Sequence, residues 1–250
     1  MRTKPSQMFP ALLVLLAPTL GAGAADVDLP ERERIHHSYE LAHGATVEVS
    51  GIAGPVEIET TNDDMANVNV VRSAPTRADL DCGEIVIEET STRLRVSSQS
   101  NCPIVRGRQS VTLKLPRRAD LSLQNIAGDV RIGPTEGMVR LESIAGHVAV
   151  AELRAASMSS LAGGLSMAIA GVGERGIHIS SVTGGIDMDV RKGVDAELSV
   201  RSVVGHVHSE ASDVSISESG DSDYQAVIGS GGSKFLIESV VGGVDIRRGR

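Results

Sequence analysis

The sequence predicts an all-β protein whose C-terminal half is a single-chain parallel β-helix, or β-solenoid. Three observations predict it. A motif of the form Ser-apolar-small-Gly-x-apolar recurs with a period of about 20 residues. The residues on both sides of each copy alternate between apolar and polar, and no segment after the N-terminal run shows the apolar period of an amphipathic helix. Such short units cannot bury an apolar face alone, so we expect the copies to stack around one core.

Residues 1–25 have the order of a secretory signal peptide. Arg2 and Lys4 precede the apolar run ALLVLLAPTL, and the small residues of GAGAAD follow it. The run is shorter than the roughly 20 residues of a membrane span, and no Cys stands at the cleavage position. We therefore expect export, to the periplasm or the cell surface, and a mature chain with no transmembrane segment.

The remaining chain is acidic and poor in aromatic residues. Removing the two N-terminal cations leaves 22 Lys and Arg against 32 Asp and Glu, a net charge of −10. An acidic chain without a basic stripe is a poor partner for nucleic acid. Beyond residue 25 the aromatic residues are Tyr39, Tyr224 and Phe235. The core must therefore consist of Val, Ile, Leu, Met and Ala, and aromatic platforms for sugars or bases are scarce.

Residues 26–44 include the polar stretch ERERIHHS, which we expect to be a loose N-terminal arm. Residues 45–118 are rich in strands but less regular, with the alternating stretches NVNVV and SVTLKLP. They also contain SGIAGPVEI, a unit related to the repeat. Because VTLKLP runs directly into LSLQNIAGDVRI, we place the transition near Pro116 and assign residues 119–250 to the solenoid.

The two cysteines, Cys82 and Cys102, flank a predicted hairpin. GEIVIEE and RLRVSSQ both alternate apolar and polar residues, and the turn-like TST separates them. An isolated pair in an oxidising compartment forms a disulfide more often than a reactive site, and this spacing matches no metal or redox motif. We expect a structural disulfide near the open end of the hairpin.

Six copies of the motif align on a glycine: NIAGDV, SIAGHV, SLAGGL, SVTGGI, SVVGHV and SVVGGV. Glycine takes positive φ without a steric penalty, so we expect a tight corner at Gly128, Gly146, Gly163, Gly184, Gly205 and Gly242. The residue three positions before each glycine should face inward, if side chains alternate along the preceding strand. Its side chain would then form hydrogen bonds with backbone groups of the corner. These residues are Asn125, Ser143, Ser160, Ser181, Ser202 and Ser239. The longer gap before the last copy suggests a degenerate copy at VSISESGDS.

Stacked copies place equivalent residues about 4.8 Å apart in columns, in which chemical groups can be sought. His147 and His206 share a column three copies apart, on the order of 14 Å, too far to share a metal ion. In the next outward column Asp187 and His208 belong to successive copies, close enough for an oriented histidine. Asp189 shares their face. No nucleophile or acid cluster accompanies them, so we expect no catalytic, metal or cofactor site.

The stretch VTLKLPRRADLSLQNIAGDVRI, followed by the Gly-marked copies, resembles the bacterial putative adhesin family of exported Gly-repeat β-solenoid proteins. In that family a sheet-rich N-terminal part ends in a strand reading apolar-x-apolar-x-Pro and then enters Gly-marked coils. The resemblance covers most of residues 45–246. It implies the fold and an adhesin-like role, and it supplies no catalytic residues.

Three hypotheses for function follow. The first is a non-catalytic envelope scaffold whose strand faces bind a protein or glycan of the envelope or cell surface. The alternative is a β-helical polysaccharide lyase or hydrolase that acts at Asp187, Asp189 and His208. The third is self-assembly, since solenoid ends expose strand edges. Because arginines in the final stretch VDIRRGR would protect one end, we predict a monomer.

Overall fold

The computed structural model describes residues 29–103 and 106–249. Sheet A contains β1 (Glu31–Glu40), β3 (Val56–Thr61), β4 (Met65–Ala74), β7 (Arg108–Pro116), β9 (Val130–Ile132), β11 (Val148–Leu153), β13 (Leu165–Ile169), β15 (Ile186–Val190), β17 (Val207–Ser209) and β21 (Val244–Arg248). Sheet B contains β2 (Thr46–Ser50), β5 (Gly83–Thr90), β6 (Arg93–Ser100), β8 (Asp120–Ala127), β10 (Met138–Ala145), β12 (Ala155–Ala162), β14 (Ile177–Thr183), β16 (Ala196–Val204), β18 (Val214–Gly220), β19 (Asp223–Ile228) and β20 (Ser233–Val241). A single short helix in this part of the chain is α1 (Arg77–Asp81), which Thr76 caps.

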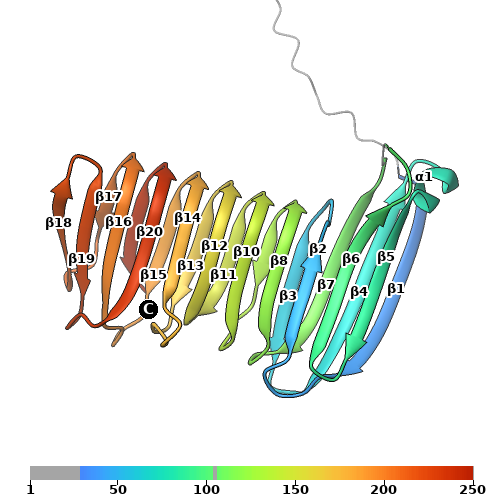
Figure 1. Cartoon of the computed structure of the whole chain (residues 1–250), viewed down its shortest axis with the longest axis horizontal. Helices are drawn as coiled ribbons and strands as arrows, with labels where there is room; N and C mark the ends of the chain where they lie inside the picture. The colour runs from blue at the N-terminus through green and yellow to red at the C-terminus, as the bar shows by residue number, and fades with distance from the viewer. Residues whose placement is uncertain (1–28, 104–105, 250) are drawn as a thin grey trace, which may run out of the picture.

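The all-β prediction is confirmed, and the strands form two large mixed sheets that remain open. They stack along the long axis of the molecule, with β1 and α1 at one end and β18 at the other (Figure 1). The order in sheet A is β1-β4-β7-β3-β9-β11-β13-β15-β21-β17, and the order in sheet B is β18-β19-β16-β20-β14-β12-β10-β8-β2-β6-β5. The pairing is parallel through the middle of each sheet, and it is antiparallel at both ends of sheet B and at the β1 end of sheet A.

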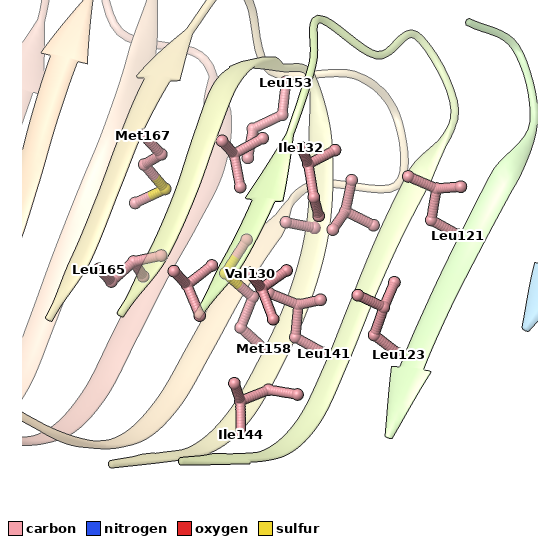
Figure 2. Packing of buried hydrophobic residues seen from close by; sticks show 14 of the residues in the cluster. Leu121, Leu123, Val130, Ile132, Leu141, Ile144, Leu153, Met158, Leu165 and Met167 are labelled. Atoms are coloured by element: carbon pink, nitrogen blue, oxygen red, sulfur yellow. The ribbon is translucent and has the colours of Figure 1, made fainter. Parts of the chain in front are cut away.

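Each motif copy supplies one strand to sheet B and the next strand to sheet A. In sheet B, Leu141 of β10 pairs with Leu123 of β8 on one side and Met158 of β12 on the other. These side chains point between the sheets, where they meet residues of sheet A such as Val130 (Figure 2). Full burial of one such aliphatic side chain stabilises the fold by about 1.5–3 kcal/mol. The alternating pattern of the sequence therefore identifies the inward strand positions.

The last motif copy does not lie at the end of the stack. Strand β20 lies between β14 and β16, and β21 lies between β15 and β17 (Figure 1). The arginines of VDIRRGR therefore do not protect an end, and this argument for a monomer was wrong. The stretch that starts at Val214 forms β18, which pairs antiparallel with β19, so the expected degenerate copy is wrong as well. Strands β18 and β19 instead form a hairpin that extends sheet B beyond β16.

The stretch ERERIHHS is a strand and not a loose arm. Strand β1 pairs antiparallel with β4 over ten residue pairs, from Glu31 with Ala74 to Glu40 with Met65. Every second side chain faces inward, and Ile35 contributes to the core while charged neighbours stay exposed. The polar composition of this stretch did not indicate a strand. Strand β1 forms the edge of its sheet, where one side faces solvent and polar residues are tolerated.

Strands of the two predicted parts share both sheets and one buried core. Strand β2 pairs with β8, and β3 pairs with β9, so the first part continues directly into the second. The predicted signal peptide lies outside the described residues. Within them, no helix is long and apolar enough to cross a membrane.

The predicted hairpin and disulfide are confirmed. Strands β5 and β6 pair antiparallel, and the Cys82–Cys102 bond joins the chain at their open end, with Cα atoms 5.3 Å apart. The Arg72 guanidinium donates to the carbonyls of Leu80 and Gly83 and forms an ion pair with Glu33. This arginine therefore ties α1 and the start of β5 to sheet A.

Candidate binding surfaces

The serines of the motif occupy a left-handed backbone position and do not face inward. Six residues have φ between 54° and 57°: Asn125, Ser143, Ser160, Ser181, Ser202 and Ser239. A left-handed residue within a strand shifts the alternation by one, so Glu142 and Ser143 both face solvent and Ile144 returns to the core. The inward prediction is therefore wrong for all six, which are exposed. In the related unit SGIAGPVEI this position is Gly51, with φ of 72°.

The corner glycines form a ladder of close backbone contacts between neighbouring copies. A Cβ on Gly163 would lie 2.2 Å from the carbonyl oxygen of Gly146, and one on Gly146 would lie 2.3 Å from that of Gly128. The ladder extends to Gly54, whose carbonyl oxygen is 2.3 Å from a Cβ on Gly128. Gly54, Gly146 and Gly163 have positive φ as well, whereas Gly128 does not and needs glycine for the close approach alone. The corner is thus a tightly packed structural edge.

Asp187 and His208, the predicted catalytic pair on sheet A, do not lie on adjacent strands. Because β21 is inserted, Asp245 lies between Asp187 and His208, which are two strand spacings apart, about 9.6 Å. Arg247 instead lies 3.5 Å from Asp187, and His206 lies 3.7 Å from Asp245. These pairs are solvent-exposed and contribute little to stability. The predicted Asp187–His208 pair is therefore wrong.

The two histidines of the inner column are separated further than predicted, by four copies instead of three. The His147 ring lies over Gly164, where an added Cβ would be 2.9 Å from its Nδ1, and its Nε2 is 3.3 Å from the Ser166 hydroxyl. His206 lies over Gly243 in the same way. Throughout residues 29–103 and 106–249, no group of three His, Cys, Asp or Glu side chains is arranged to hold a metal ion.

Asp120 is the centre of a charged cluster at the start of β8. Its carboxylate accepts two hydrogen bonds from Arg175, at 2.7 and 3.1 Å, and one from the Met138 N–H at 2.7 Å. Burial raises the pKa of this carboxyl, but the bonds from Arg175 and Met138 and the charge of Arg140 outweigh burial, so the pKa is lowered overall.

We expect Asp120→Asn to lower the free energy of unfolding at pH 7 by about 1–2 kcal/mol, because Arg175 and the Met138 N–H lose a charged acceptor. The folded-state pKa lies below the unfolded value, about 3.9, so the stabilisation is present above that pH and is lost as the pH falls through the folded pKa. Urea unfolding from pH 7 to pH 2 would measure this. Asp187→Asn is the exposed control, and an equal loss there would contradict the expectation.

The outer face of sheet B has a hollow of about 640 Å³ near the end of the sheet that β18 forms. It lies over β16, β19 and β20, where the sheet changes from parallel to antiparallel pairing. Lys234, Gln225 and Glu197 line it, and in the described part of the chain their side chains make no hydrogen bond or ion pair. Val227, 45% exposed, and Leu236 add an apolar patch. Free polar groups around an apolar patch suit binding of another molecule.

Sequence reasoning missed this hollow. Its walls come from strands that are adjacent only because β20 is inserted beside β16 and β19 folds back on the other side. The residues concerned are outward strand positions with no motif of their own. The only local signal is Val227, an apolar residue at an exposed position.

No family model matches the chain, and no curated protein matches it. Among solved structures, a putative cell adhesion protein from Clostridium sporogenes ATCC 15579 is 12% identical over 87% of this chain and 100% of that chain, with a TM-score of 0.40. A putative adhesin from Bacteroides fragilis NCTC 9343 is 12% identical over 87% and 98%, with a TM-score of 0.34. One from Parabacteroides merdae ATCC 43184 is 8% identical over 86% and 96%, with a TM-score of 0.33. Similarities this weak carry no argument about function, and the resemblance to the adhesin family stays a prediction.

Proposed function

We propose that this chain is an exported, non-catalytic binding scaffold, a β-solenoid that holds a partner of the cell envelope on the outer face of sheet B. The regular alternation of motif copies between two parallel-paired sheets supports a solenoid. The Cys82–Cys102 disulfide supports an oxidising compartment outside the cytoplasm.

The hollow over β16, β19 and β20 is the observation that carries the proposal. It combines a free ammonium group at Lys234, a free amide at Gln225 and the exposed apolar side chain of Val227. A partner that covers this patch would bury apolar surface and satisfy the polar groups at its rim. The hollow lacks aromatic rings apart from the buried Phe235, so it favours a protein segment over a stacked sugar ring.

The test is binding of the purified mature chain to envelope preparations of the organism that makes it. We expect saturable binding, and about tenfold weaker binding by the double variant Val227→Asp, Lys234→Glu, because both changes fall in the hollow. Asp187→Lys, on the outer face of sheet A, is the matched control and should bind like the unchanged chain. Absence of saturable binding, or equal loss in the control, would contradict the proposal.

Protease treatment of intact and opened cells would show on which side of the outer layer the chain, and therefore its partner, lies. Digestion in intact cells would mean exposure at the cell surface and a role in adhesion. Protection until the envelope is opened would mean a periplasmic scaffold.

A further inference from the structure

The edge of the molecule opposite the glycine ladder contains an arginine whose main chain is fixed and whose side chain has no partner among the described residues. Arg117 follows β7, and its N–H donates to the Thr61 carbonyl at 2.9 Å. Its own carbonyl accepts from the Glu136 and Gly137 N–H groups and from the Thr135 hydroxyl. These bonds hold the Cα in place, so the side chain starts from a defined position.

The Arg117 guanidinium makes no hydrogen bond or ion pair with any described residue. Its Nε is fully covered and has no acceptor. The neighbouring carboxylate of Glu136 is bound to Arg118, at 3.1 Å, and Arg118 also lies 2.9 Å from the His43 ring. A half-buried cation without a counter-charge lowers the stability of the fold, so a purely structural role does not explain it.

Arg117 lines a hollow of about 200 Å³, and Arg154, Glu136 and Glu152 line it as well. Arg154 likewise makes no ion pair within the described chain, and its Nη1 lies over Gly171, 3.2 Å from where a Cβ would be. Its main-chain carbonyl accepts from the Gly173 N–H at 2.8 Å. Among the described residues, two arginines without an ion pair therefore share this hollow with the Glu152 carboxylate and with Glu136, which is paired with Arg118.

We propose that Arg117 and Arg154 form a binding site for an oxyanion, a carboxylate or phosphate group, carried by a hydroxylated molecule such as an acidic sugar. Guanidinium groups hold such anions through paired, charge-assisted hydrogen bonds. The Glu152 carboxylate, which also lines the hollow, would accept hydrogen bonds from the hydroxyl groups of that molecule. The site lies on the loops that lead from sheet A back to sheet B, away from the hollow on sheet B, so it goes beyond the proposed function and stands or falls separately.

The experiment is calorimetric titration of the purified mature chain with galacturonate, inorganic phosphate and neutral galactose at constant ionic strength. We expect binding of at least one of the two anions and none of galactose. Arg117→Gln and Arg154→Gln should each weaken binding by about tenfold or more, since each removes half of the cationic pair. Arg131→Gln, an exposed arginine on β9, is the control and should bind as the unchanged chain does.

A second readout separates a binding arginine from a structural one. Without ligand, Arg117→Gln should unfold at the same temperature as the unchanged chain or higher, because an uncompensated charge is removed. A lower unfolding temperature would assign Arg117 a structural role and overturn the proposal. Binding of neither anion, or equal weakening by Arg131→Gln, would overturn it as well.

Discussion

Gly163→Ala is expected to destabilise the fold by about 4 kcal/mol or more, because its Cβ would meet the main chain of the neighbouring copy. The Cβ position lies 2.2 Å from the carbonyl oxygen of Gly146, and backbone on both sides is held by sheet hydrogen bonds. Glycine 163 also has φ of 144°, where a side chain adds about 1–3 kcal/mol of strain. Urea denaturation followed by circular dichroism would measure the change.

Gly232→Ala is the matched control for this prediction. Gly232 has φ of 126°, close to that of Gly163, but nothing lies within 4 Å of its Cβ position. We expect this variant to lose about 1–3 kcal/mol of stability, the cost of backbone strain alone. If the two variants lost equal stability, backbone strain alone would explain the glycines and the close approach between copies would be irrelevant.

Loss of the Cys82–Cys102 disulfide should lower the free energy of unfolding by about 3 kcal/mol, because the bond restricts the unfolded chain. Their sequence separation is 20, and the closed segment contains β5, which forms the edge of sheet B and pairs only with β6. We expect amide hydrogen exchange to accelerate most in β5 and β6. Thermal unfolding with and without dithiothreitol would measure the global effect.

The double variant Cys82→Ser, Cys102→Ser provides the control. The sequence contains two cysteines, so dithiothreitol should leave the variant unchanged and should lower the unmodified chain to the level of the variant. An unmodified chain that kept its stability in dithiothreitol, while remaining reduced, would contradict a stabilising role for the bond.

Alternation within each strand was enough to identify most of the core. Leu123, Leu141 and Met158 are buried as their period predicts, because a strand turns its side chains to opposite faces at every step. The same rule misplaced Ser143. A left-handed residue breaks the alternation, and serine is not a residue from which this conformation is expected.

The order of the copies could not be read from their spacing. The strands that begin at Ile177, Ala196 and Ser233 all present apolar residues to the core at equivalent positions, so each suits the others as a neighbour. The pairing of β20 between β14 and β16 therefore depends on contacts that are distant in sequence. The wrong Asp187–His208 pair follows directly from this, since their distance depends on which strand lies between them.

By itself the sequence determined the all-β class, the positions of the six aligned motif copies, most of the inward strand residues and the disulfide, because each depends on local periodicity or on a unique pair of residues. The tertiary structure decided the order of the stack, the exposure of the serines, the hollow on sheet B and the unpaired Arg117. These depend on which segments become neighbours, and near-identical copies leave that choice open at the level of local sequence.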